Sequence, residues 1–153
     1  GCCSPEVRFS SKEAGGPWTT TTLAADGVVT GFGMDASGIL YLLWEETYQA
    51  LTAHLLKKQP LDVWEESTIP SVANSPLVVG QSGSVYANSP DGIRTNFSGT
   101  WEILTGIFAG WAMAVDTSNQ IHRVSAISQG DYYSLHYARY RVTNAVDENC
   151  DGR

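Results

Sequence analysis

The sequence predicts an all-β fold, and three observations support this prediction. Segments rich in Val, Ile, Thr, Tyr and Trp alternate with joins made of Gly, Asn, Asp and Ser, which is typical of short strands and turns. A short motif recurs three times along the chain, as it does in repetitive β architectures. No segment has a sustained helical period, although Leu51, His54 and Leu55 leave a short helix possible within residues 48–58.

The recurring motif consists of an apolar residue, a tight turn and a β-rich segment that ends at Tyr or His. Its three copies are residues 34–41, 79–86 and 115–122, whose turns open at Asp35, Gly80 and Asp116. Each turn contains Ser followed by Gly or Asn, and these residues tolerate the positive φ that a tight hairpin needs. The turns are 45 and 36 residues apart and the Trp residues upstream of them are 46 and 37 residues apart, so two independent markers share one period, and the second unit is nine residues shorter by both.

Four short strands are expected in each repeated unit. The first begins at a Trp, the second is small and apolar, the third follows the turn and the fourth is more polar. In that order the expected strands are 18–23, 28–34, 39–44 and 51–56 in the first unit, 64–69, 76–79, 84–87 and 93–97 in the second, and 101–104, 111–115, 120–126 and 135–142 in the third.

Four strands in a unit of about 40 residues are typical of a β-propeller blade. The small second strand suits the crowded centre of a propeller, and the Trp-led strand suits the outer edge, where a large ring fills the space between blades. We therefore expect blades at 18–58, 64–97 and 101–143, preceded by a segment, 1–17, that holds the last strand of another blade, and followed by an acidic tail, 144–153.

Three blades do not close a ring, because known propellers have about four to eight. An open row of blades would leave strand edges and apolar faces exposed. We therefore expect another polypeptide to complete the ring, either a second copy or another fragment of a longer precursor.

Composition narrows the class of protein further. The chain has 153 residues, of which 42% are hydrophobic and 16% charged, and this corresponds to about one globular domain. No apolar run approaches the roughly 20 residues that span a bilayer. The net charge of -7 argues against binding to nucleic acid, which needs clustered Lys or Arg.

Residues 35–41, and residues 116–122 followed by 135–138, resemble the repeats of bacterial secreted propellers that are related in pattern to sialidase-like propellers. The resemblance covers about residues 5–143 and implies a secreted or cell-surface protein. The middle unit departs from it, because Gly80 stands where the other units have Asp. A catalytic sialidase is not expected, because the arginine triad, the paired Tyr and acid, and the Asp-box spacing of that family have no match.

The tail, residues 145–153, resembles an Asp-x-Asn-Cys-Asp-Gly element of a metal-binding motif in large secreted bacterial proteins. The resemblance implies a Ca²⁺ site at Asp147, Asn149 and Asp151, since Ca²⁺ prefers oxygen ligands. One such fragment does not supply the six or more oxygens that Ca²⁺ takes, so a solvated acidic tail is the alternative.

The three cysteines lie at the two ends of the chain, where a covalent link would hold the termini. Cys150 is expected to pair with Cys2 or with Cys3, which leaves one thiol available for another chain.

We predict a non-catalytic extracellular module for binding or assembly. A propeller lectin is one alternative, with aromatic platforms between blades. The candidate ligand-binding residues are Tyr41, Trp44, Tyr86, Trp111 and His122. A fragment of a secreted hydrolase is the other alternative. No catalytic residue is assigned, and the acidic doublets 45–46 and 65–66 are interpreted as solvated charges at strand edges.

Overall fold

The computed structural model describes residues 5–46, 52–59, 63–70, 76–104, 112–128, 130 and 133–141. These residues form strands and turns, and none of them lies in a helix. The strands are β1 (Val7–Lys12), β2 (Trp18–Ala24), β3 (Val28–Met34), β4 (Leu40–Glu45), β5 (Thr52–Lys58), β6 (Trp64–Pro70), β7 (Leu77–Val79), β8 (Val85–Ser89), β9 (Gly92–Thr95), β10 (Glu102–Leu104), β11 (Ala112–Val115), β12 (Gln120–Ser128) and β13 (Tyr133–Arg141). The predicted all-β class is confirmed, and the short helix left possible within 48–58 is wrong where the structure describes it, because Thr52–Lys58 is a strand.

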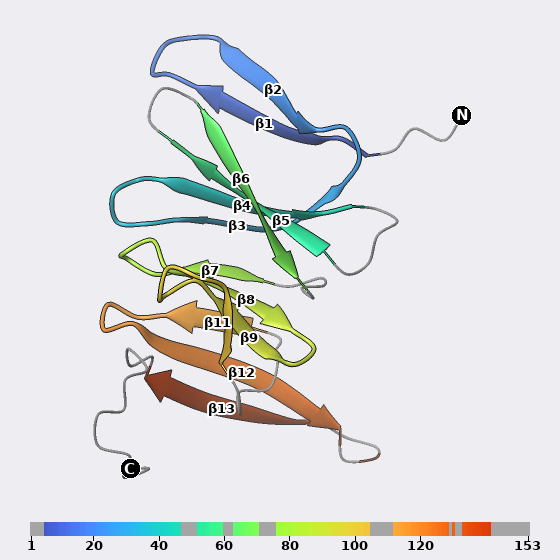
Figure 1. Cartoon of the computed structure of the whole chain (residues 1–153), viewed down its shortest axis with the longest axis vertical. Coiled ribbons are helices and arrows are strands. Elements are labelled where there is room, and N and C mark those ends of the chain that lie inside the picture. The colour runs from blue at the N-terminus through green and yellow to red at the C-terminus, as the bar shows by residue number, and fades with distance from the viewer. Residues whose placement is uncertain are drawn as a thin grey trace.

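The strands form four antiparallel sheets that lie one upon another in chain order (Figure 1). The first sheet holds β1 and β2, and the second holds β3 to β6 in sequence order. The third holds β7 to β10, also in sequence order, and the fourth holds β11 to β13. Within the described ranges the sheets form an open stack, and no closed barrel or ring is present.

The strands that begin at Trp are the last strands of their sheets rather than the first. β6, which begins at Trp64, pairs with β5, and β2, which begins at Trp18, pairs with β1. The boundaries of the sheets are therefore shifted by one strand from the predicted units 18–58, 64–97 and 101–143. The reason is that each Trp-led strand forms its hydrogen bonds with the strand before it.

A hydrophobic cluster fills each space between neighbouring sheets. Val7 packs with Leu42, Trp44 and Leu56 between the first and second sheets. The second and third sheets share the largest cluster, which contains Tyr41, Leu43, Ala53, Leu55, Ile69, Leu77, Val85 and Ala87. The third cluster, between the third and fourth sheets, is built on Tyr86, Ile93 and Ile121. The middle strands β4 and β8 are buried along almost their whole length because sheets cover both of their faces.

The first strands of the three later sheets lie side by side along one line, with β3 against β7 and β7 against β11 (Figure 1). Glycine permits the first of these contacts. A Cβ on Gly31 would clash with Leu77, and a Cβ on Gly33 would lie 2.6 Å from Cγ2 of Val79. The expectation that the small apolar strand occupies the crowded side of each unit is consistent with this packing.

Candidate functional site

The turn between β3 and β4 is held by the carboxylate of Asp35. Its Oδ1 accepts hydrogen bonds from the backbone amides of Ser37 and Ile39, at 2.8 and 3.0 Å. Its Oδ2 accepts a hydrogen bond of 3.1 Å from the hydroxyl of Tyr41. Burial raises the pKa of Tyr41 to about 12, and the bond to Asp35 and the negative charge of Asp35 add to the increase. The carboxylate therefore ties the turn to the strand that follows it.

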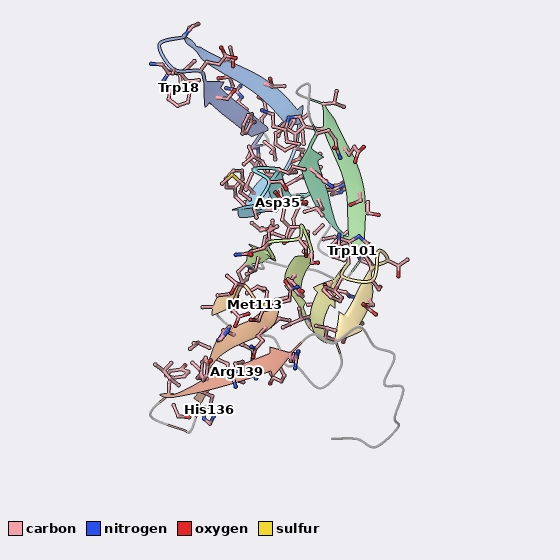
Figure 2. The ribbon with its side chains drawn as sticks, turned by 90° about the vertical axis from the view of Figure 1, so that its left-hand side faces the viewer. Trp18, Asp35, Trp101, Met113, His136 and Arg139 are labelled. Atoms are coloured by element: carbon pink, nitrogen blue, oxygen red, sulfur yellow. The ribbon has the colours of Figure 1, made fainter. Side chains whose placement is uncertain are left out.

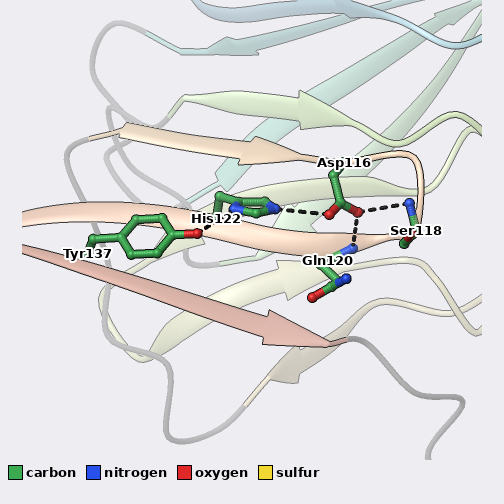
Figure 3. Close-up of polar contacts among 5 residues, drawn as sticks. All are labelled: Asp116, Ser118, Gln120, His122 and Tyr137. Atoms are coloured by element: carbon green, nitrogen blue, oxygen red, sulfur yellow. Dashed lines mark hydrogen bonds and ion pairs between the residues drawn. The ribbon is translucent and has the colours of Figure 1, made fainter.

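The turn between β11 and β12 repeats this arrangement with a different partner (Figure 3). Oδ1 of Asp116 accepts hydrogen bonds from the amides of Ser118 and Gln120, at 2.8 and 2.9 Å. Oδ2 of Asp116 lies 3.0 Å from Nε2 of His122, and Nδ1 of His122 lies 2.7 Å from the hydroxyl of Tyr137 on β13. In the neutral tautomer that fits this chain, His122 donates Nε2–H to the carboxylate and accepts the hydroxyl proton of Tyr137 at Nδ1.

The electrostatics of Asp116 follow from these bonds. The amide of Gln120 has the largest effect, and with His122 it holds the pKa of the Asp116 carboxyl below its usual value. A carboxylate that orients an imidazole toward a hydroxyl is also the pattern of an activated nucleophile. The same carboxylate position is buried with Tyr41 at Asp35, however, and there it serves packing. The two copies share the hydrogen bonds to the turn amides and differ in the partner of Oδ2 and in burial.

The middle turn keeps the backbone of the other two without the carboxylate. The amide of Gly80 donates to the Ser84 carbonyl at 2.7 Å, and the amide of Gly83 donates to the Gly80 carbonyl at 3.0 Å. Tyr86, the counterpart of Tyr41 and His122, is fully buried. Burial raises the pKa of Tyr86, and the hydroxyls of Ser84 and Thr95 lower it in part.

The middle turn covers the aromatic residue of the second sheet, and the third turn lies against the middle turn. Gly83 lies over Tyr41, so that a Cβ on this glycine would be 2.6 Å from the tyrosine hydroxyl. The amide of Ala36 donates to the carbonyl of Gln81 at 3.3 Å, which joins the first two turns. Asn119, with a φ of 56°, brings its Oδ1 to 3.4 Å from a Cβ built on Gly80. His122 holds the equivalent position in the fourth sheet, and no described sheet covers it.

No described sheet covers the outer face of the fourth sheet, which carries exposed apolar side chains beside His122 and Arg139. Cross-strand pairing places Val124 opposite Tyr137, and side chains two residues apart share a face, so Leu135 lies on the same face as Tyr137. All three are exposed. Figure 2 shows Trp18 at one end of the stack, and Arg139 and His136 at the other.

A second exposed apolar face lies on β3, the first strand of the second sheet. Gly31 and Gly33 of β3 face the third sheet, so the side chains of Phe32 and Met34 between and after them lie on the opposite face. Both are exposed, because β1 and β2 pack on β4, β5 and β6 of this sheet and leave this face of β3 uncovered.

The structure buries three of the predicted ligand-binding rings. Tyr41, Trp44 and Tyr86 belong to the hydrophobic clusters between sheets. A sugar could stack on these rings only if the sheets separated. His122 is partly exposed on the open face, and Trp111 lies outside the described residues.

His54 gathers a cluster that the sequence did not reveal. Its ring stacks on Trp44 with centroids 4.2 Å apart, its Nδ1 lies 2.7 Å from Glu66, and its Nε2 lies 3.5 Å from Glu46. One carboxylate from each acidic doublet thus converges on the histidine across β4, β5 and β6. Residues 46, 54 and 66 are far apart in the chain, so only the strand register could have revealed the cluster. The same holds for Tyr137 beside His122.

The residues predicted to bind a metal ion or to form a disulfide lie outside the part of the chain that the structure describes. The part of the chain that the structure covers holds no group of three or more His, Cys, Asp or Glu side chains arranged for a metal ion. Asp147, Asn149 and Asp151, and likewise Cys2, Cys3 and Cys150, lie outside the described residues.

A cavity of about 400 Å³ lies beside the hairpin that joins β1 and β2. Its lining includes Lys12, Glu13 and Thr19 of that hairpin and Lys58 of β5. Of the predicted ligand-binding residues that the structure describes, none contributes to this lining. Within the described ranges, no helix has the length and hydropathy needed to cross a membrane.

No protein-family model matches the chain, and no curated protein matches it. The relation to secreted propeller repeats rests on residues 35–41, 116–122 and 135–138 alone, and it stays a prediction.

Proposed function

We propose that this chain is part of a β-propeller and that it serves as a non-catalytic assembly module of a secreted or cell-surface complex. In this proposal, further sheets of the same repeat pack on the outer face of the fourth sheet and on the face formed by Phe32 and Met34. In a preparation that contains only this chain, a second copy of the chain supplies those sheets. The support comes from the way its sheets pack and from what their end faces carry.

The packing of the sheets favours a propeller segment. The second and third sheets are four-stranded antiparallel meanders, as blades are. Their first strands, with β11, lie side by side, and apolar clusters fill the spaces between sheets. Rows of blades around a central line have this arrangement.

One observation carries the assembly function. Positions that are buried in the second sheet are exposed in the fourth, although their residues remain apolar. Leu43 is 0% exposed and its counterpart Val124 is 38% exposed, while Ala53 is 0% exposed and its counterpart Leu135 is 77% exposed. Contiguous exposed apolar residues on a sheet mark a surface that binds another protein.

The test is the mass of the chain in solution, measured by light scattering over a range of concentrations. We expect wild-type chain to associate beyond the 16.5 kDa of one copy. Leu135→Asp should remove the association, because a carboxylate would be desolvated in the contact. Val63→Asp is the matched control, since Val63 is also exposed but belongs to neither open face. A monodisperse single copy at every concentration, with no partner polypeptide in the preparation, would overturn the proposal.

A further inference from the structure

The sheet of β1 and β2 corresponds to the outer half of a complete sheet. β2 begins at Trp18 and β6 begins at Trp64, and each pairs with the strand before it in the chain. The hairpin packs on β4, β5 and β6 of the second sheet, with Val7 against Leu42 and Trp44 of β4, and with the ring of Phe9 5.2 Å from the ring of Trp64.

The two inner positions of this first sheet hold no strand among those described. β2 is the strand that pairs with β1, and the opposite edge of β1 has no described partner. In the second and third sheets, the strands equivalent to β1 pair at this edge with β4 and β8. An unpaired edge is a template for strand addition.

The described strands also leave the neighbouring face of the second sheet uncovered. Phe32 and Leu77 occupy the same position relative to the turn, three residues before Asp35 and Gly80. Leu77, which the second sheet covers, is 8% exposed, whereas Phe32 is 55% exposed. Met34 is exposed in the same way, although its counterpart Val79 packs against the second sheet.

The interface between the second and third sheets indicates the chemistry of an element that would cover Phe32 and Met34. Gly31 and Gly33 leave room there for Leu77 and Val79 of the next sheet. An element that covers Phe32 and Met34 in the same way would offer small residues at the corresponding places of its inner strand, although the third sheet has Pro76 and Val78 at those places where it meets β11. Its second strand must pair with β1.

We infer that the free edge of β1, together with the face formed by Phe32 and Met34, is an acceptor site for a β-hairpin with the chemistry of the first two strands of this repeat. The hairpin would complete a four-stranded sheet by strand addition, in which backbone hydrogen bonds give affinity and the small residues give specificity. This inference rests on the proposed assembly function and names the partner of one of its two faces.

The probe is a synthetic peptide of residues 28–46 of this chain, which carries Gly31, Gly33 and the turn at Asp35. Titrated into the full chain, the peptide should bind saturably in a one-to-one ratio and should slow hydrogen exchange in β1. The same peptide with Gly33→Leu should bind at least about tenfold more weakly, because the added side chain would meet Phe32 or Met34. Phe32→Asp in the chain should weaken binding to a similar extent. Circular dichroism checks that this variant remains folded, as expected for an exposed position.

Absence of saturable binding would overturn the inference, as would equal binding of the two peptides or unchanged exchange in β1. Leu135→Asp, at the far end of the stack, should leave peptide binding unchanged. If the chain associates through Leu135 but does not bind the peptide, the acceptor site is wrong and the assembly function stands. If the chain neither associates nor binds the peptide, both are wrong.

Discussion

The covered face of the second sheet and the open face of the fourth sheet are built on the same plan and differ in what lies over them. Leu43 pairs with Leu55 across β4 and β5, and Val124 pairs with Tyr137 at the equivalent place across β12 and β13. The first pair is buried under the third sheet, while the second pair is exposed. The comparison teaches that the open face has the composition of an interface between sheets without the sheet that would cover it.

The two carboxylate turns show the same contrast in polar terms. Asp35 and Tyr41 are buried together, and burial raises the pKa of the tyrosine. Asp116 and His122 lie on the open face, where hydrogen bonds lower the pKa of the carboxyl. The turn hydrogen bonds are common to both, so the difference in burial arises from the third sheet, which covers Asp35 and Tyr41.

The largest expected effect is a difference in stability loss between substitutions on the covered face of the second sheet and on the open face of the fourth sheet. Leu43→Ala should lower the free energy of unfolding by about 2–5 kcal/mol, because it leaves a cavity between two sheets. Val124→Ala should cost less than about 1 kcal/mol, since Val124 has solvent on its outer side. Urea unfolding followed by circular dichroism measures both, at a chain concentration low enough for light scattering to show a single copy. Equal losses under that condition would show that the two faces are covered alike within one chain.

Overpacking the line of inner strands should have the next largest effect. Gly31→Ala places a Cβ against Leu77, and we expect it to lower the free energy of unfolding by about 1–3 kcal/mol. Gly16→Ala is the control, because a Cβ there meets Glu13 at ordinary contact distances, and its effect should stay within about 0.5 kcal/mol. A neutral Gly31→Ala would mean that β3 and β7 are not in close contact.

Removal of the buried carboxylate comes third. Asp35→Ala leaves the hydroxyl of Tyr41 and two turn amides without their acceptor, which should cost about 1–3 kcal/mol. Asp116→Ala should cost less, because the groups it frees on the open face can bind water. The double variant Asp35→Ala/Tyr41→Phe should recover part of the loss. If Asp116→Ala proved the more damaging of the two single changes, the open face would be covered.

The smallest expected effect is a pH dependence at the open face. Hydrogen bonds lower the folded-state pKa of Asp116 below its unfolded value of 3.8, so the unfolded chain binds the proton more readily. The stability that Asp116 contributes is therefore present above pH 3.8 and is lost as the pH falls through the folded-state value. Unfolding of wild type and Asp116→Asn should converge in acid. Parallel curves would show that the carboxylate has no preference for the charged form in the folded state.

Much of the fold could be predicted from local sequence, because strands and turns are local features. The Asp-x-Ser-Gly and Asp-x-Ser-Asn turns, and the β-rich segments beside them, located the hairpin from Val28–Met34 to Leu40–Glu45 and its repeats. The sheet to which a Trp-led strand belongs is not a local feature. Trp64–Pro70 could pair with the strand before or after it, and the hydrogen bonds to Thr52–Lys58 decide the matter.

The site was less predictable for the same reason. The convergence of Glu46 and Glu66 on His54 depends on the register of three strands, and the contact of Tyr137 with His122 depends on the register of two. The sequence predicts Tyr41 and Tyr86 as aromatic platforms between blades in the lectin alternative. Their burial follows from the stacking of sheets, which the pattern of a single repeat does not contain.

The central claim is that successive sheets stack face to face along one line of inner strands, and a designed disulfide tests it most directly. A Cβ on Gly33 lies 3.4 Å from Cβ of Val79, close to the separation in a disulfide. In the double variant Gly33→Cys/Val79→Cys, we expect the two residues to link under mild oxidation, and trypsin should release them in one disulfide-linked peptide pair. If both introduced thiols remain free, or pair only with the native cysteines, then β3 and β7 are not neighbours and the stack is wrong.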